Sequence, residues 1–373
     1  MSQDFTTRLQ LQLREVALRD ERRSPLRRRL GGLRVGMPGP AAATAVALAA
    51  VLLVAIVVAG GLLWRGGDER VGHPKVVADF PLADNLGWVA SGFGSVWTAD
   101  TNKRDVLRVD PRTHAITARI HTGGDTNAFG GDPIVNSGAG AVWAIARAPS
   151  TDGGHRVVRI DPETNRVTAR VTLPARQAPL VGDIQIADGR PWVLTSAGAI
   201  ELDPATAQPL HFVAVVQPAG EPGPIWSIVA GPELWVLSRQ GTLDRYALAS
   251  GRKVASDPVP FAGAQGVVPT EEGPLYALRN GVLALADDSG KKVWRRQIGT
   301  ISTVPFVMGD TVWVHASDMN GGRDRLVELD LLSGKPRSST GLPEFGIRGF
   351  TAVGDDALWL SAPNGRMMIV KPG

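Results

Sequence analysis

The residue types that most often carry out chemistry are sparse in this 373-residue sequence. It contains no Cys, which excludes disulfides, thiol catalysis and zinc–thiolate sites. The six His are far apart, at positions 73, 114, 121, 155, 211 and 315. No His-Glu-x-x-His or Gly-x-Ser-x-Gly pattern occurs. The sequence therefore supplies no catalytic residue set, no metal ligand set and no cofactor motif, and an enzyme is not the favoured interpretation.

Two short segments resemble known sites superficially. Gly92-Phe93-Gly94 has the glycine content of a phosphate loop, but no helix is predicted after it, so a strand turn is favoured. Ser317–Asp324 is rich in oxygen ligands, yet it lacks the spacing and the terminal Glu of an EF-hand. We interpret the second segment as a hydrophilic loop.

Four residues are candidates for ligand binding: Asp132, Asp183, Trp226 and Arg348. Each stands near the start of a predicted inner strand of the repeat described below, where loops on a rigid scaffold usually carry function. An aromatic side chain beside an Arg combines stacking with charge, as at many interaction hot spots. The alternative for each residue is a solvated loop position or a turn cap.

These candidates depend on an internal repeat that extends over most of the chain. Gly94-Ser-Val-Trp97 is followed by Val106-Leu-Arg-Val-Asp110-Pro-Arg-Thr113, and Gly140-Ala-Val-Trp143 by Val157-Val-Arg-Ile-Asp161-Pro-Glu-Thr164. The aromatic position recurs at Trp97, Trp143, Trp192, Trp235, Tyr276, Trp313 and Trp359. The turn position recurs at Asp110, Asp161, Asp203, Ala247, Asp287, Asp330 and Lys371. Seven copies of about 43 residues match four-stranded propeller blades, and the aromatics are expected to pack between blades.

The first copy illustrates the four strands that we expect in each blade. They are Gly87–Ala90, Ser95–Thr98, Val106–Asp110 and Ala115–His121, from the inner to the outer strand. Alternating apolar and polar residues indicate half-buried strands. Asp-Pro-x-Thr suits the turns, because Pro presets φ and Asp and Thr bind their own backbone.

The seventh copy lacks a fourth strand, because the sequence stops at Gly373. An unpaired edge would promote aggregation. Lys75–Leu82 is expected to supply the missing outer strand, so that the two ends of the domain share one blade. The predicted organisation is a basic cytoplasmic tail at 1–40, a transmembrane helix at 41–64, a linker at 65–74 and an all-β, seven-bladed propeller at 75–373.

The predicted membrane span is Ala41–Trp64, which contains no charged residue. A helix of this length covers roughly 36 Å, enough to cross the hydrocarbon core. A cleaved signal peptide is the alternative, but its apolar stretch would be shorter and its basic head shorter too. We therefore expect an uncleaved anchor in contact with membrane lipid.

The positive charge is concentrated before this span. Residues 1–34 contain nine Arg and four acids, a net charge of +5, whereas the whole chain carries +4. The remainder thus carries about −1, so no nucleic-acid partner is expected. Basic residues stay in the cytoplasm, which predicts a cytoplasmic N-terminus and an extracytoplasmic propeller. The tail itself is either solvated, bound to anionic lipid as an amphipathic helix, or docked to a cytoplasmic regulator.

The first two copies resemble the repeats of streptogramin-lyase-like and YVTN-type propellers, through Gly94–Thr113 and Gly140–Thr164. The fifth copy, which includes Leu275–Leu278 and Ala284–Trp294, resembles a pyrroloquinoline-quinone-type repeat. The lyase resemblance implies an axial site of His and an acid around a metal, with a Pro-His pair opening inner strands. Here Pro133-Ile134 and Pro224-Ile225 stand instead, which counts against lyase activity.

The favoured function is a membrane-anchored, extracytoplasmic module that binds a protein or a small molecule, acting as a sensor or scaffold. The alternative is a propeller enzyme of lyase or hydrolase type acting on a small molecule or a cell-envelope component. Fold alone does not choose between them, because propellers host unrelated activities.

Overall fold

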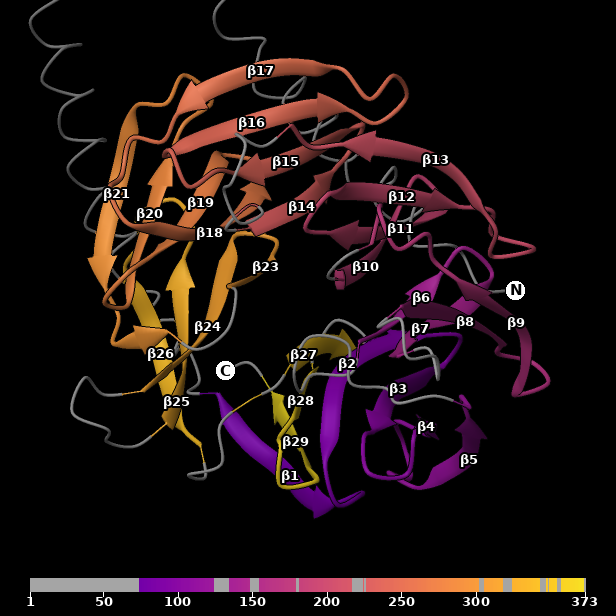
Figure 1. Ribbon diagram of the computed structural model, residues 1–373. Helices are drawn as coiled ribbons and strands as arrows, with labels where there is room; N and C mark the ends of the chain where they lie inside the picture. The colour runs from indigo at the N-terminus through magenta and orange to yellow at the C-terminus, as the bar shows by residue number, and fades with distance from the viewer. Residues whose placement is uncertain are drawn as a thin grey trace, which may run out of the picture. The chain divides into compact units, whose positions relative to one another are not determined.

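The computed structural model describes residues 74–123, 134–147, 154–178, 181–216, 224, 226–301, 305–317, 324–342, 347, 349–353 and 357–371. These residues form seven antiparallel sheets that follow one another around a ring (Figure 1). The prediction of an all-β propeller with seven four-stranded blades is therefore confirmed.

Each blade is numbered by its place along the chain, and its strands run from the inner to the outer position. Blade 1 is β2 (Leu86–Gly92), β3 (Ser95–Asp100), β4 (Asp105–Val109) and β5 (Ile116–His121). Blade 2 is β6 (Val135–Gly138), β7 (Ala141–Arg147), β8 (His155–Asp161) and β9 (Arg166–Thr172). Blade 3 is β10 (Val181–Ala187), β11 (Arg190–Thr195), β12 (Gly198–Leu202) and β13 (Pro209–Ala214).

The second half of the ring repeats this plan. Blade 4 is β14 (Trp226–Ala230), β15 (Glu233–Leu237), β16 (Thr242–Ala247) and β17 (Lys253–Pro258). Blade 5 is β18 (Ala264–Thr270), β19 (Gly273–Leu278), β20 (Val282–Ala286) and β21 (Lys292–Gln297). Blade 6 is β22 (Thr300–Ile301) and β23 (Phe306–Met308), which both pair with β24 (Thr311–Ser317), followed by β25 (Asp324–Asp330) and β26 (Pro336–Gly341).

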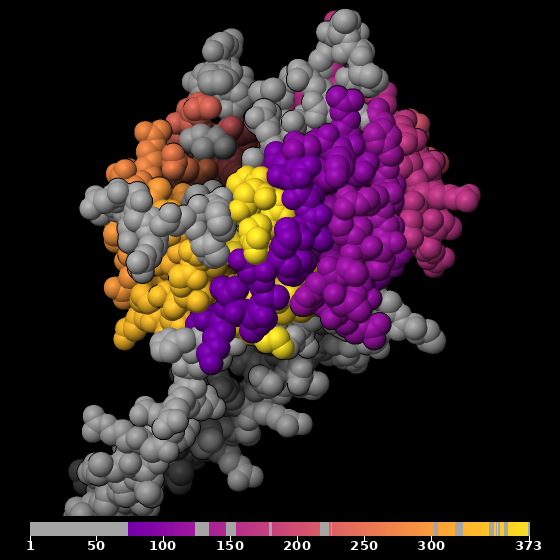
Figure 2. Space-filling view, turned by 90° about the horizontal axis from the view of Figure 1, so that it is seen from below, coloured from indigo at the N-terminus to yellow at the C-terminus, as the bar shows by residue number. Residues whose placement is uncertain are grey.

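Blade 7 closes the ring with strands from both ends of the domain. It contains β27 (Gly349–Val353), β28 (Ala357–Ser361), β29 (Arg366–Lys371) and, at the outer edge, β1 (Lys75–Pro81). Lys75 pairs with Lys371 and Pro81 with Arg366. Figures 1 and 2 show the indigo first strand beside the yellow last strand. The expected sharing of one blade by the two ends is thus present.

The recurring aromatics form the core between blades. All seven lie on the second strand of their blade, and six of them are buried, with Trp235 half-buried. Trp97, for example, packs with Val135 and Val158 of the next blade. Burying side chains of this size dominates the stability of such a core, so the predicted packing role is correct for these positions.

The alternating strand directions give the propeller two distinct faces. We call the face that holds the links from second to third strands, and from one blade to the next, the loop face. The opposite face holds the tight turns from first to second and from third to fourth strands, and we call it the turn face. Lys75 and Lys371 pair at the turn-face end of blade 7, so the chain enters the propeller on the turn face.

The N-terminal segments of the prediction lie outside the described residues. This applies to the basic tail, the span Ala41–Trp64 and the linker, so their boundaries stay predictions. From residue 74 onward, the described part of the chain contains no helix long and apolar enough to cross a bilayer.

Candidate functional site

The structure places two of the four predicted binding residues on adjacent inner strands. Asp183 lies near the start of β10 in blade 3, and Trp226 begins β14 in blade 4. Both positions are at the loop-face end of their strands. Asp132 and Arg348 lie outside the described residues. The site is therefore built from Asp183, Trp226 and their neighbours.

Asp183 follows an irregularity in β10 that re-aims its side chain. The register of β10 against β11 shifts between Val181 and Asp183, which leaves Gly182 as a bulge residue. Ile184 packs into the core between blades 2 and 3. Because side chains alternate along a strand, Asp183 and Gln185 point the other way, toward β14 of blade 4.

Both carboxylate oxygens of Asp183 accept a hydrogen bond from an uncharged donor. The Ile184 amide donates to Oδ1 at 2.7 Å, and Gln185 Nε2 donates to Oδ2 at 2.8 Å. The Gln185 Oε1 atom in turn accepts a hydrogen bond from the Val229 amide of β14 at 2.7 Å. The carboxylate is thus held in place by a side chain that also joins blades 3 and 4.

The charge on Asp183 is not neutralised by any described residue. Asp183 is the one charged residue within the described inner strands β2, β6, β10, β14, β18, β22, β23 and β27. Burial raises the pKa of its carboxyl to about 6, although the hydrogen bonds from Gln185 and Ile184 oppose this shift. Asp183 is half-buried, so it keeps some contact with solvent although protein atoms replace part of its surrounding water. Proteins tune acids in this way at many functional sites.

Trp226 occupies the next boundary around the ring. Its side chain packs with Leu237, Val267 and Tyr276 in the core between blades 4 and 5. It also lies close to Gly266 of β18, where a Cβ atom would stand 4.0 Å from the indole. The indole Nε1 is buried and has no hydrogen-bond partner among the described residues. Trp226 is therefore mainly a packing residue with one unsatisfied donor.

The predicted residues are consequently neighbours in the ring without forming one cluster. Asp183 faces the boundary of blades 3 and 4, whereas Trp226 faces the boundary of blades 4 and 5. Arg348 lies outside the described residues, so its predicted combination with Trp226 stays a prediction. Within the described residues, Asp183 is the feature that packing does not explain.

Polar side chains that join the inner strands were not predicted from the sequence. Asn136 Nδ2 donates to the Ile184 carbonyl at 2.8 Å, and Ser137 Oγ donates to the Ser91 carbonyl at 2.6 Å. With Gln185, these contacts connect blades 1 to 4 around the channel. One pattern in the sequence could have indicated them: a polar residue within a short inner strand whose other residues are small or apolar.

The turn face presents carboxylates in a different setting. Asp110, Asp161 and Asp203 each accept hydrogen bonds from two backbone amides of their own turn. These bonds lower the pKa of each carboxyl. Such turns explain the recurrence of Asp-Pro-x-Thr through local structure alone.

Arginines extend these turns into contacts between blades. Arg108, opposite Trp97, donates to the Pro162 carbonyl of blade 2 at 2.8 Å. Arg159, opposite Trp143, donates to the Pro204 carbonyl of blade 3 at 2.8 Å. Both guanidinium groups also lie over the paired indole, at 5.1 and 5.9 Å from the ring centre. The repeated Arg is thus a structural residue.

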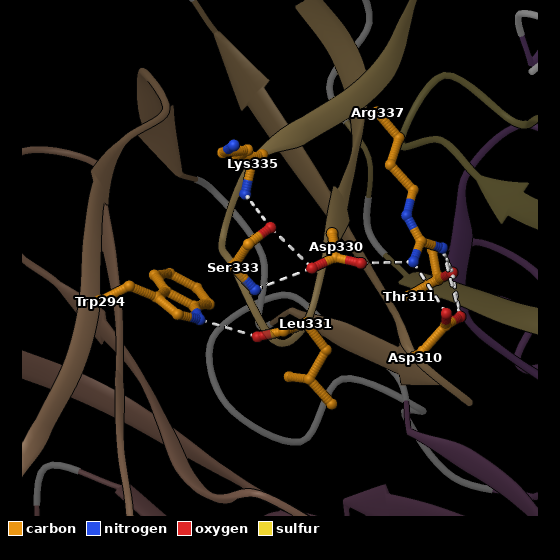
Figure 3. Close-up of polar contacts among 8 residues, drawn as sticks. All are labelled: Trp294, Asp310, Thr311, Asp330, Leu331, Ser333, Lys335 and Arg337. Carbon is orange, nitrogen blue, oxygen red and sulfur yellow. Dashed lines mark hydrogen bonds and ion pairs between the residues drawn. The ribbon is translucent and has the colours of Figure 1, made fainter. Parts of the chain in front are cut away.

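Blade 6 combines contacts within the blade with one contact to blade 5 (Figure 3). Arg337 bridges Asp310 and Asp330, at 2.8 and 2.6 Å. Hydrogen bonds from Ser333 and Arg337 lower the pKa of Asp330 to about 2. Trp294 of blade 5 donates to the Leu331 carbonyl at 2.7 Å, which ties the two blades together.

The described histidines lie away from the inner strands. His114 is in the turn before β5, where it stacks on Phe80 at 5.0 Å, and His121 ends β5. His155 begins β8, His211 lies in β13 and His315 in β24, which are a third, a fourth and a second strand of their blades. Among the described residues, no group of three or more His, Asp or Glu is arranged to hold a metal ion.

A shallow pocket of about 340 Å³ lies on the outer side of the ring, away from the channel. It is formed between blades 5 and 6, and its lining includes Gln297, Arg325, Arg337 and Ser338. Arg337 is already engaged by two carboxylates, and Ser338 donates to Glu328 at 2.5 Å. These polar groups are occupied by the protein itself.

No protein-family model matches the chain, and no curated protein matches it. Several solved structures are similar to the chain in fold. A streptogramin B lyase superposes with a TM-score of 0.60 at 14% identity, covering 82% of this chain and 100% of the lyase. BBS1N, solved in complex with ARL6DN, gives 0.60 at 14% identity, with coverage of 80% and 96%. BamB from Moraxella catarrhalis gives 0.52 at 13% identity, with coverage of 80% and 98%. At such identities these likenesses show one thing, that the chain has a β-propeller fold.

Proposed function

We propose that this chain is a membrane-anchored, extracytoplasmic binding module whose propeller takes a protein or small-molecule ligand at the loop face, beside Asp183. The observation that carries the proposal is the unneutralised carboxylate of Asp183 on an inner strand. A half-buried, partly desolvated charge without a counter-charge is unfavourable for folding, and such groups are common where a ligand or a reaction uses them. The polar side chains of Asn136, Ser137 and Gln185 on the inner strands are engaged by neighbouring blades.

The two faces support this location. Asp-turns and inter-blade arginines account for the turn face, and the chain enters the propeller there at Lys75. The loop face is the opposite surface, at which the described strands before and after the longer links end and begin. A protein-binding role for this fold has a precedent in BBS1N, which was solved in complex with ARL6DN. The likeness to streptogramin B lyase keeps an enzyme as the alternative, but no specific described feature favours it.

The membrane assignment rests on the uncharged segment Ala41–Trp64 and the nine Arg before residue 35. Because the chain has no Cys, single-cysteine variants test it cleanly. Glu271→Cys lies in an exposed turn, and Ser24→Cys lies in the predicted tail. A membrane-impermeant maleimide should label the first variant in intact cells and the second only after lysis. The reverse order of labelling would overturn the orientation.

The binding assignment is tested by affinity capture from membranes of the source cells. Asp183→Asn alters the loop-face site. The double variant Arg112→Gln/Glu163→Gln alters the turn face, and it keeps the hydrogen bonds that the backbone amides of these two residues donate to Asp110 and Asp161. A partner retained by the wild type and by the turn-face variant, but lost with Asp183→Asn, supports the proposal. A partner lost only with the turn-face variant contradicts it.

A further inference from the structure

The chemistry of Asp183 indicates what kind of ligand the loop-face site would take; this inference rests on the proposed binding function. Each carboxylate oxygen accepts one hydrogen bond, from the Ile184 amide and from Gln185 Nε2. A carboxylate oxygen has two lone pairs, so each retains acceptor capacity. Both protein donors are neutral, and they orient the group without cancelling its charge.

On the inner strands that the structure describes, no other charged residue accompanies Asp183. The strands in contact with β10 are β6, β7, β11 and β14, and their titratable residues are Arg190 of β11 and Arg147 at the last position of β7. Arg190 is at the turn-face end of β11 and forms an ion pair with Glu201. Asp183 therefore gives this inner strand a local negative potential. Its partial desolvation strengthens the attraction of that potential for a cation.

A metal ion is not the cation that this arrangement suits. Hard divalent ions take several oxygen ligands, and structural zinc takes four ligands. No group of three or more metal-ligating side chains occurs among the described residues. One oriented carboxylate with two free acceptor positions instead matches the donor geometry of an ammonium or guanidinium group.

We propose that Asp183 is the anionic half of a recognition site for an organic cation, either a protonated amine or a guanidinium, that enters the channel from the loop face. Gln185 acts as a positioning residue, because it holds the carboxylate with Nε2 while its Oε1 is fixed by the Val229 amide. Cation binding removes the penalty of the unpaired charge. The same chemistry is offered by a free amine and by a Lys or Arg side chain of a partner protein.

The test measures binding of methylguanidinium and n-butylammonium to the full chain by calorimetry at low ionic strength. Since burial raises the pKa of Asp183 to about 6, only about a tenth of the carboxyl is ionised at pH 5. The affinity should therefore be about tenfold weaker at pH 5 than at pH 7. Asp183→Asn should abolish both the binding and its pH dependence. Asp188→Asn is the matched control, because Asp188 lies in the exposed turn of the same hairpin and Asn tolerates its φ of 48°.

A second set of probes identifies the source of the cation. An acetylated, amidated pentapeptide with a central Arg between glycines is compared with its Gln counterpart. Tighter binding of the Arg peptide than of methylguanidinium indicates a protein side chain, and equal binding indicates a free small cation. The inference is overturned if no cation binds saturably to the wild type, or if Asp183→Asn binds equally well. If cations do not bind but a partner is still lost with Asp183→Asn, the binding function stands and the cation assignment fails.

Discussion

Aspartates at the turn face and at the channel have the same side chain and opposite surroundings. Asp330 accepts hydrogen bonds from Ser333 and Arg337, which lower its pKa to about 2. Asp183 is half-buried with no described cation beside it, and desolvation raises its pKa to about 6. The first carboxylate stabilises the fold in its charged form, whereas the second destabilises it. This contrast separates the part of the propeller built for stability from the part available for recognition.

The largest expected effect concerns the closure of the ring, which holds both regions in place. Replacing Lys75–Pro81 by seven Gly and Ser residues removes the β1 side chains that cover β29 and leaves that strand without its outer partner. We expect aggregation, or a fall in Tm of at least about 10 °C. Lys75→Gln/Val77→Thr, which changes exposed side chains and keeps the strand, is the control. Unchanged melting of the Gly/Ser variant would mean that this pairing does not close the domain.

Removing the charge at the turn face should destabilise the fold. Asp330→Asn weakens the ion pair with Arg337 and the hydrogen bonds from Ser333. We expect a loss of about 1–2 kcal/mol in unfolding free energy near pH 7, allowing for partial solvent exposure. Because the folded pKa is depressed, this contribution is present above about pH 4 and is lost as the pH falls toward 2. Urea denaturation at pH 7 measures it, with Asp288→Asn in the exposed turn of blade 5 as the control.

Removing the charge at the channel should have the opposite sign. The folded pKa of Asp183 is raised, so its favourable contribution is complete below about pH 4 and is lost as the pH rises through about 6. Asp183→Asn should therefore stabilise the chain by about 1–2 kcal/mol at pH 8 and by much less at pH 4. Urea denaturation at the two pH values checks this result. Destabilisation at pH 8 would show that the carboxylate serves the structure.

Changes to exposed turn side chains should have the smallest effect. Arg112 and Glu163 contribute backbone amides, not side chains, to the hydrogen bonds of their Asp-turns. Arg112→Gln/Glu163→Gln should alter the unfolding free energy by less than about 0.5 kcal/mol. A larger loss, measured as a shift in Tm, would mean that the turn face depends on more than its local hydrogen bonds.

The sequence predicted the architecture because the repeat encodes it redundantly. A Trp on the second strand and an Asp-turn after the third recur in most copies, and both are local signals that survive drift elsewhere. The closure by Lys75–Leu82 followed from counting strands, although the strand ends one residue earlier, at Pro81. The division of the inner strand of blade 6 into β22 and β23 left no comparable pattern in the sequence.

The candidate site was less predictable, because it depends on which side of a strand each residue faces. Asp183 and Trp226 were chosen because each stands near the start of an inner strand, and the structure places them on neighbouring inner strands. The bulge at Gly182 and the alternation of β14 then turn them toward different blade boundaries. Gln185 donates to the Asp183 carboxylate two residues away and accepts from the Val229 amide across 44 residues of sequence. The second contact depends on the tertiary structure and leaves no local pattern.

The most direct test is a carboxyl titration of the full chain by NMR with ¹³C-labelled aspartate, with signals assigned from Asp183→Asn and Asp330→Asn. One experiment then compares both regions under identical conditions. We expect the titration midpoint of the Asp183 carboxyl near pH 6 and that of the Asp330 carboxyl near pH 2. A midpoint for Asp183 at or below pH 4 would contradict the central claim, because the channel carboxylate would then be as well satisfied as those of the turns.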